Sequence, residues 1–353
     1  MMNIKDLINK LYITNSLSFD ELLYITENIS KQEDKNYLFE KARETRYKHY
    51  ENKVFLRGLI EISNYCKNDC YYCGIRCSNK NITRYRLTEK EILKCCDIGY
   101  EIGYRTFVLQ GGEDPFLNDD IMCNIIYSIK SKYPDCAITL SIGEKNYNSY
   151  ERYFLSGADR FLLRHETSTD CHYKKLHPEN LSLENRKNCL KNLKKIGYQV
   201  GAGFMVGSPF QTNEDVVRDL IYLKELDPHM VGIGPFIPHH DTKFKDFPHG
   251  DLNKSIIILA LTRLLLPKCL LPATTALASI SENGRDLGLL AGCNVIMPNL
   301  SPHEFRKNYS LYDNKLSVGE EACEYHKSLE ASIKQLGLFV DYSRGDNIEW
   351  RRI

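Results

Sequence analysis

The sequence predicts a parallel (β/α)8 barrel of the TIM type, with a helical N-terminal extension and a C-terminal helix. From Val54 onward, a short run of apolar and β-branched residues is followed by a polar loop and then by a segment with helical spacing of apolar residues. This unit occurs eight times. Right-handed crossovers place the helices of such units outside the sheet, so that a closed parallel barrel buries both sheet faces. The length of 353 residues also suits one barrel with short additions.

Three regions follow from this pattern. Residues 1–53 are polar, show helical spacing of Leu and Ile, and contain no strand-like run, which indicates a helical N-terminal extension. The barrel is expected over residues 54–300. Residues 301–353 are expected to pack on the barrel with a polar loop, one helix around 319–336 and a charged tail.

The predicted helices have recognisable starts between the predicted strands. Thr88 and Glu91 have the spacing of a capping box, while Ser182 and Thr212 suit N-cap positions of two later helices. The eight strands are expected at 54–62, 105–110, 137–142, 160–165, 199–206, 230–237, 270–276 and 294–298.

The composition excludes several classes of function. No stretch approaches the roughly 20 apolar residues that span a bilayer, so no membrane role is expected. Lysine plus arginine (47) nearly equals aspartate plus glutamate (46), which gives no overall basic field for nucleic acid. The N-terminus lacks the apolar core and cleavage site of a secretory signal, so the protein is expected in the cytoplasm. Small molecules or proteins are the expected partners.

The cysteines indicate metal chemistry. In a reducing compartment, an odd total of 13 argues against a disulfide framework and for thiolate ligands beside buried, inert thiols. Cys66, Cys70 and Cys73 follow the first predicted strand with C-x3-C-x2-C spacing. Three thiolates in one loop can ligate three irons of a cubane 4Fe-4S cluster and leave the fourth iron open to another ligand.

The cysteines and histidines also have other interpretations. A zinc site normally has four closed ligands, and isolated cysteines usually pack in cores, so the cluster is favoured for the three-cysteine loop. Cys77 is expected to be free. His239, His240 and His249 lack a carboxylate at matching spacing, which favours a loop role. Packing is the expectation for Cys95, Cys96, Cys123, Cys136, Cys171, Cys189, Cys269 and Cys293.

Polar residues gather at the predicted strand ends, where ligands of such barrels bind. Glycines there expose backbone carbonyls and allow close approach of a ligand. An arginine can clamp a carboxylate, and a glutamate can accept hydrogen bonds from ribose hydroxyls, although salt bridges on the barrel rim are the alternative. The end of the sixth predicted strand (230–237) is small and apolar, and such a strand end can lie against adenine. The candidate cofactor-binding residues are Tyr72, Gln110, Gly111, Gly112, Glu113, Ser141, Glu144, Arg164, Glu166, Arg186, Met205 and Ile237.

A second group suits a bound anion. Arg57 lies inside the first strand, and a guanidinium that faces a barrel interior needs an anionic partner. Thr274 and Thr275 offer hydroxyls and backbone N–H groups after the seventh strand. Tyrosines after the eighth strand can donate hydrogen bonds or close the cavity. The candidate substrate-binding residues are Arg57, Thr274, Thr275, Ala276, Met297, Tyr309 and Tyr312.

The cysteine spacing, with Tyr72 before the third cysteine, resembles the signature of the radical S-adenosylmethionine (SAM) superfamily. The resemblance implies one 4Fe-4S cluster held by Cys66, Cys70 and Cys73, with the amino and carboxylate groups of SAM on the open iron. It also implies that Gly111, Gly112 and Glu113 bind the SAM amino group. One electron then breaks a carbon–sulfur bond, which yields methionine and a 5'-deoxyadenosyl radical.

Taken together, the cysteine loop and the strand ends over residues 54–315 resemble the HydE family of FeFe-hydrogenase maturases. That family implies a role in building the dithiomethylamine bridge of the diiron subcluster, from an iron-bound cysteine with carbonyl and cyanide ligands supplied by a HydG-like maturase. A reductase or ferredoxin as electron donor, transient contact with other maturases and an anaerobic host are also expected. The resemblance implies that the substrate-binding group faces a negatively charged organometallic substrate.

One departure and three alternatives remain. Some family members carry three further cysteines near the C-terminus, whereas that region here offers only Cys323, so no second cluster is expected. A lysine mutase that makes methylornithine and a biotin-synthase-like enzyme share the barrel and the cysteine loop. A non-catalytic iron–sulfur or zinc scaffold would bind metal without consuming SAM, and would not need polar residues at eight successive strand ends.

Overall fold

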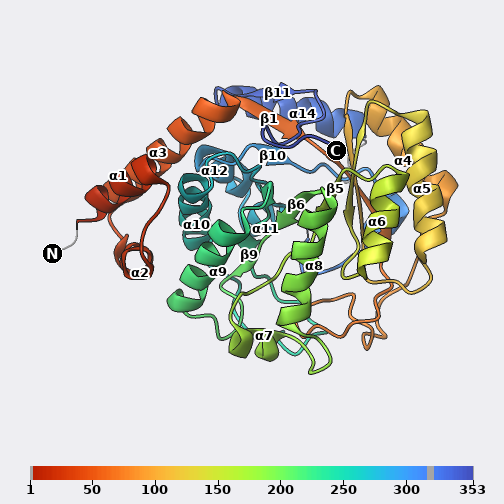
Figure 1. Cartoon of the computed structure of the whole chain (residues 1–353), viewed down its shortest axis with the longest axis horizontal. Helices are drawn as coiled ribbons and strands as arrows, with labels where there is room; N and C mark the ends of the chain where they lie inside the picture. Colours follow the sequence, from red (N-terminus) through yellow and green to blue (C-terminus); the bar gives the residue numbers. More distant parts are fainter. Residues whose placement is uncertain (1–2, 316–321, 353) are drawn as a thin grey trace.

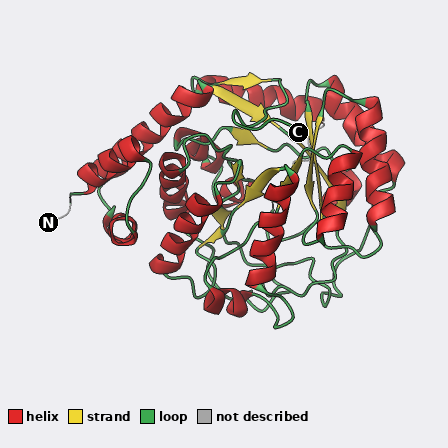
Figure 2. Ribbon diagram, viewed as in Figure 1, coloured by secondary structure: helices red, strands yellow, loops and turns green. Residues whose placement is uncertain are grey.

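The computed structural model describes residues 3–315 and 322–352 and forms the predicted barrel (Figure 1). Figure 2 shows the strands inside and the helices around them. The strands are β1 (Lys53–Leu56), β2 (Gly58–Ser63), β3 (Thr106–Gly111), β4 (Ala137–Ser141), β5 (Arg160–Leu162), β6 (Gln199–Ala202), β7 (Met205–Val206), β8 (Met230–Val231), β9 (Gly234–Pro235), β10 (Val295–Ile296) and β11 (Phe339–Asp341).

The helices begin and end close to the predicted positions. Thr88 and Glu91 form a capping box at α4, and Ser182 and Thr212 cap α8 and α9, as predicted. The helices are α1 (Ile4–Thr14), α2 (Phe19–Asn28), α3 (Gln32–Tyr50), α4 (Glu89–Glu101), α5 (Asp119–Lys132), α6 (Tyr147–Ser156), α7 (Asp170–Leu176), α8 (Leu183–Ile196), α9 (Asn213–Leu226), α10 (Leu252–Leu265), α11 (Thr275–Ile280), α12 (Gly284–Leu290), α13 (His303–Arg306) and α14 (Ala322–Gln335).

The sheet is parallel and closes on itself. Its main part has the strand order β2-β3-β4-β5-β6-β8. Single bridges from Met230 to Leu270 and from Pro272 to Val295 continue it to β10. Strand β10 pairs with β1, and a bridge from Leu59 to Asn299 completes the ring. The predicted fold class is therefore confirmed.

Several strand predictions need correction. The runs predicted at 54–62, 199–206 and 230–237 are each interrupted and form β1 and β2, β6 and β7, and β8 and β9. The seventh strand was predicted at 270–276, but its ladder is reduced to two bridges and helix α11 begins at Thr275. Pro272 lacks the N–H that a continued ladder would use, which helps to end the pairing. In addition, the tail contains strand β11, which pairs with β1. Three residues in a charged region are too few to give a strand signal.

Helix α10 explains where the N-terminal helices pack. Its residues 255–265 are all buried, and a helix that is apolar on every side must be covered on every side. Helices α1 and α3 contact α10, and α9 and α12 contact it as well. Figure 1 shows α1–α3 at this flank of the barrel. None of the helices in residues 3–315 and 322–352 has the length and hydrophobicity needed to cross a bilayer.

The C-terminal tail closes the barrel at the amino ends of its strands. The Arg344 carbonyl accepts hydrogen bonds from Thr106 Oγ1 and from Arg160 Nη2, both at 2.7 Å. The Asn347 N–H donates to Gln199 Oε1 at 2.8 Å. Since these partners stand at the starts of β3, β5 and β6, the tail leaves only the opposite end of the barrel for ligands.

Replacement of Asp159 by Asn is expected to destabilise the protein by about 3–5 kcal/mol, because it breaks a buried charge cluster. The Asp159 carboxylate is fully buried and contacts Lys130 at 3.3 Å, Arg344 at 3.1 Å and Arg352 at 2.8 Å. Denaturant unfolding measures the loss. The control Asp120→Asn alters a side chain that is 79% exposed, and should change stability by less than about 0.5 kcal/mol. Equal stability of the two variants would contradict this role of the tail.

Candidate active site

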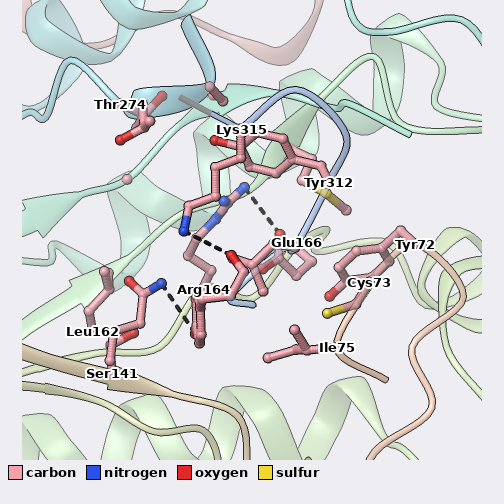
Figure 3. Close-up of a pocket in the computed structure, with 18 of the residues that line it drawn as sticks. Tyr72, Cys73, Ile75, Ser141, Leu162, Arg164, Glu166, Thr274, Tyr312 and Lys315 are labelled. Atoms are coloured by element: carbon pink, nitrogen blue, oxygen red, sulfur yellow. Dashed lines mark hydrogen bonds and ion pairs between the residues drawn. The ribbon is translucent and has the colours of Figure 1, made fainter. Parts of the chain in front are cut away.

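A cavity of about 370 Å³ opens at the carboxyl ends of the barrel strands. Figure 3 shows Tyr72 and Cys73 on one side of it and Thr274 on the other, with Arg164 and Lys315 between them. All but two of the predicted site residues line this cavity. They are Cys66, Cys70, Cys73, Tyr72, Gln110, Gly111, Gly112, Glu113, Ser141, Arg164, Glu166, Arg186, Met205, Ile237, Thr274, Thr275, Ala276, Met297, Tyr309 and Tyr312.

The cysteine loop is shaped by backbone hydrogen bonds. The Lys67 N–H donates to Glu113 O at 2.9 Å, and the Cys77 N–H donates to Asn68 O at 2.9 Å. The Arg84 guanidinium, which the sequence did not single out, donates to carbonyls of the loop, including Ile75 O at 2.8 Å. Hydrogen bonds within the protein therefore hold the loop in this conformation.

The three thiols suit an iron–sulfur cluster. Cys66, Cys70 and Cys73 are free, half-buried and line one cavity. Burial raises the pKa of each thiol, and that of Cys73 to about 12, so bare thiolates are disfavoured there. A bound metal cation stabilises the thiolate form of its ligands and so offsets the free-energy cost of burying their negative charge. Three ligands facing a cavity leave space beside the cluster for a further ligand.

The remaining cysteines mostly follow the expectation of packing. Cys95, Cys96, Cys136, Cys189, Cys269 and Cys293 are buried, and Cys123 is partly buried. Cys171 is exposed, which corrects the prediction for that residue, because it lies on the outer face of the short helix α7. Cys77 is exposed and free. The side chain of Cys323 lies outside the described residues, so the prediction made there stays a prediction.

Tyr72 is oriented by a histidine. The Tyr72 hydroxyl lies 3.2 Å from Nε2 of His177, whose Nδ1 lies 3.0 Å from the Tyr173 carbonyl. Since a carbonyl only accepts, Nδ1 carries the proton, and Tyr72 donates to Nε2. Burial lowers the pKa of His177 to about 3, which keeps the ring neutral. The ring therefore fixes the orientation of the Tyr72 side chain within the cysteine loop.

Acid is expected to destabilise the protein partly through His177. An unfolded histidine has a pKa of about 6.5, so the stabilisation from a neutral His177 is complete above that pH and decreases as the pH falls toward 3. The loss between pH 6.5 and pH 5 is about 2 kcal/mol. Unfolding at both pH values, with wild type and His177→Gln, measures it. If the variant loses as much stability as wild type, the neutral histidine is not the cause.

The Gly111–Glu113 turn packs tightly against the cysteine loop. A Cβ at Gly112 would lie 2.2 Å from Tyr65 O and 2.8 Å from Cys66 Cβ. The Glu113 carboxylate accepts from the Glu144 N–H at 2.9 Å and lies 3.4 Å from Lys67 Nζ. The turn and the loop therefore form one rigid wall of the cavity.

Charged groups from the middle strands complete the wall. Arg164 Nη2 lies 3.2 Å from Glu166 Oε2. Glu166 has a left-handed φ of 65°, and strain of this kind at a non-glycine residue is typical of functional sites. The Arg186 Nε lies 2.7 Å from Glu144 Oε1. Both arginines reach the cavity with a carboxylate beside them.

Two predicted site residues are not at the cavity. Glu144 lies behind Arg186, which it holds, and does not line the cavity. The placement predicted for Arg57 is wrong. Its fully buried guanidinium lies 2.7 Å from Met230 Sδ and donates to Gly345 O at 3.3 Å, at the end of the barrel that the tail closes. Burial lowers the pKa of Arg57, and Asp346 partly opposes that effect.

Three charged residues at the cavity were missed. Glu61, Arg285 and Lys315 all line it. Glu61 is hidden in an apolar strand run, although a carboxylate in a buried strand is itself a signal of function. Lys315 and Arg285 lie in segments without a motif, so only the fold brings them to the site.

His239, His240 and Asp313 lie close enough together to hold an ion. However, His239 Nδ1 accepts from the Asp241 N–H at 3.1 Å, so a neutral ring carries its proton on Nε2, the atom 4.0 Å from Asp313. His240 Nδ1 lies 2.6 Å from Asp313 Oδ1. A hydrogen-bonded network explains this cluster, and Asp313, more than 70 residues further along the chain, supplies the carboxylate that the local sequence lacks at matching spacing.

Comparisons with known proteins show the family of this chain. The sequence profile of the radical SAM superfamily matches residues 60–223. The FeFe hydrogenase maturase subunit HydE of Thermotoga maritima is 47% identical over 284 residues, which cover 80% of this chain and 81% of that protein. The 3-methylornithine synthase of Methanosarcina acetivorans is 30% identical over 322 residues, 91% of this chain and 88% of that protein.

Solved structures share the whole architecture. The crystal structure of methylornithine synthase (PylB) superposes with a TM-score of 0.83 at 26% identity and covers 95% of this chain and 97% of that chain. The crystal structure of the FeFe-hydrogenase maturase HydG superposes with a TM-score of 0.79 at 20% identity, with coverage of 96% and 76%. At that identity the second likeness shows the fold alone.

The barrel and the three-cysteine loop define a radical SAM enzyme. Within that superfamily, the chain belongs to the HydE family. Membership implies a 4Fe-4S cluster and SAM as cofactors.

Proposed function

We propose that this enzyme reductively cleaves SAM to a 5'-deoxyadenosyl radical during assembly of the FeFe-hydrogenase active site. Its substrate is an iron-bound cysteine with carbonyl and cyanide ligands, supplied by a HydG-like maturase, and it acts in synthesis of the dithiomethylamine bridge. The observation that carries the proposal is the 47% identity to HydE across a chain whose three-cysteine loop faces a cavity.

The cofactors are held by one half of the cavity. Cys66, Cys70 and Cys73 ligate the cluster, which when bound supplies the electron that breaks a carbon–sulfur bond of SAM. The Gly111–Glu113 turn binds the SAM amino group. Arg186 clamps its carboxylate, and Glu166 accepts hydrogen bonds from its ribose. The remaining cofactor contacts come from Tyr72, Gln110, Ser141, Arg164, Met205 and Ile237.

The substrate occupies the other half of the cavity. Thr274 and Thr275 offer hydroxyl donors to an anion, and Tyr309 and Tyr312 cover it. The Tyr309 hydroxyl lies 3.3 Å from Gln110 Nε2, so this tyrosine stands between the two halves. Enclosure excludes water and limits side reactions that would compete with the reaction at the substrate.

A lysine mutase that forms methylornithine is the second candidate, because 3-methylornithine synthase is 30% identical over 91% of the chain. The discriminating experiment uses anaerobically reconstituted, reduced protein and measures 5'-deoxyadenosine release with three additions: the cysteine-ligated iron carbonyl cyanide complex, L-lysine or dethiobiotin. Stimulation by the iron complex alone supports the maturase. Stimulation by lysine or by dethiobiotin transfers the function to that rival.

A further inference from the structure

One end of the cavity carries a surplus of positive charge. Arg164 is paired with Glu166, and Arg186 is paired with Glu144. Arg285 also lines the cavity, but within residues 3–315 and 322–352 no carboxylate pairs with it, and its Nε is buried without a hydrogen-bond partner. Its guanidinium carbon lies 5.8 Å from the centroid of the Tyr325 ring. A partly buried guanidinium without a carboxylate partner favours an anionic ligand.

The position of Arg285 is fixed by tight packing. It is the second residue of helix α12, which begins at Gly284. A Cβ at Gly284 would lie 2.1 Å from the Leu277 carbonyl, so α12 starts in direct contact with α11. Helix α11 follows Thr274, whose Oγ1 is buried without a hydrogen-bond partner. Two unsatisfied donors therefore lie on adjoining segments of the cavity wall.

Lys315 brings a second cation from the C-terminal segment. Its side chain is 13% exposed, and its ammonium pairs with Glu61 and donates to Tyr309 O at 2.9 Å. An ammonium has three N–H donors, so one remains for a ligand. Glu61 is fully buried and accepts from Asn299 Nδ2 at 3.0 Å. This carboxylate is therefore engaged in holding Lys315.

The segment that carries Lys315 is anchored beside the cysteine loop. The Gly74 N–H donates to Leu311 O at 2.9 Å, and the Asp313 N–H donates to Pro238 O at 3.0 Å. A Cβ at Gly74 would lie 2.2 Å from Ser310 O. In Figure 3, Lys315 extends into the cavity between Tyr312 and Thr274.

We propose that Lys315 and Arg285, with the Thr274 hydroxyl, bind the anionic group of the substrate, and that Glu61 is the positioning residue for Lys315. This inference rests on the proposed function and deepens it, since it names the residues that recognise an anionic iron complex. Lys315 and Arg285 would then provide the cationic substrate contact that the sequence predicted for Arg57. The same two cations would repel the ammonium groups of lysine, the substrate of the second candidate.

The test follows binding rather than turnover. Full-length, cluster-reconstituted protein with SAM and without reductant is titrated with the cysteine-ligated iron carbonyl cyanide complex, and the infrared bands of its carbonyl and cyanide ligands report binding. Lys315→Met and Arg285→Met are each expected to raise the Kd of the complex about tenfold or more, because each removes a charge-assisted contact. The Kd of SAM should change much less.

Three comparisons separate recognition from folding. Lys307→Met changes an exposed lysine of the same segment, outside the cavity, and should bind the complex as wild type does. Lys315→Met leaves the buried Glu61 carboxylate without its cationic partner, which can itself disturb folding. The double variant Glu61→Gln/Lys315→Met removes both charges, so it must show the same loss of affinity for the iron complex as Lys315→Met. For the positioning role, Glu61→Gln should weaken binding about tenfold and Glu61→Asp should restore most of it.

The outcomes also distinguish the two proposals. If wild type binds the iron complex and the Lys315 and Arg285 variants bind it equally well, the anion site is wrong and the proposed function stands. If wild type does not bind the iron complex but responds to lysine, the proposed function itself fails.

Discussion

Replacement of Cys73 by Ala is expected to prevent stable assembly of the 4Fe-4S cluster and to abolish SAM cleavage. The side chain faces the cavity from a loop whose shape is fixed by backbone hydrogen bonds, so no neighbouring thiol can move into its place without breaking them. Two thiols cannot hold the cubane with an open position beside it. Iron and sulfide content, the visible absorption of the reconstituted protein and 5'-deoxyadenosine release measure the loss.

The matched control is Cys77→Ala. Cys77 lies four residues further along the same loop, but its side chain is exposed and does not line the cavity. Its removal should leave iron content and SAM cleavage close to wild type. Loss of the cluster in both variants would show that four cysteines of the loop bind metal, as in a closed zinc or scaffold site, and would contradict the assignment of three ligands.

The second large effect is expected from Gly112→Ala. The added methyl group would lie 2.2 Å from the Tyr65 carbonyl, and backbone must shift to admit it. That shift displaces the start of the cysteine loop and the turn that we propose binds the SAM amino group. We expect SAM cleavage to fall by about a hundredfold or more, since small misplacements of reacting groups cost that much.

Gly111→Ala is the comparison for this steric argument. A Cβ at Gly111 would lie 3.2 Å from Ser63 O and 3.4 Å from an Ile62 side chain, which a movement of a few tenths of an ångström relieves. A clearly smaller loss of SAM cleavage is therefore expected than for Gly112→Ala. If the two variants lose activity equally, the turn needs glycine for its backbone conformation in general, and close contact with the cysteine loop is not the reason for Gly112.

The sequence predicted the features that depend on neighbouring residues. The C-x3-C-x2-C loop and the Gly111–Glu113 turn follow strands directly, so their place at the carboxyl ends of β2 and β3 follows from the barrel alone. Helix caps such as Thr88 with Glu91 are equally local. For these elements, knowledge of the fold class was sufficient to place the side chains.

Features that depend on distant contacts were missed or misplaced. Arg57 lies at the break between β1 and β2, and the tail residue that accepts its hydrogen bond, Gly345, lies almost 290 residues later in the chain. Glu61 in β2 lines the cavity and meets Lys315, which lies about 250 residues later in the chain. No periodicity within either segment indicates such a pair.

Reductive cleavage of SAM is the activity that we propose for this three-cysteine barrel. The most direct measurement is the joint appearance of 5'-deoxyadenosine and methionine after anaerobic reconstitution, reduction and addition of SAM, followed over time in wild type and Cys73→Ala. Equal amounts of both products are expected from wild type, and none from the variant. An intact, reducible 4Fe-4S cluster in wild type without either product would contradict this activity and would favour a scaffold that carries clusters without radical chemistry.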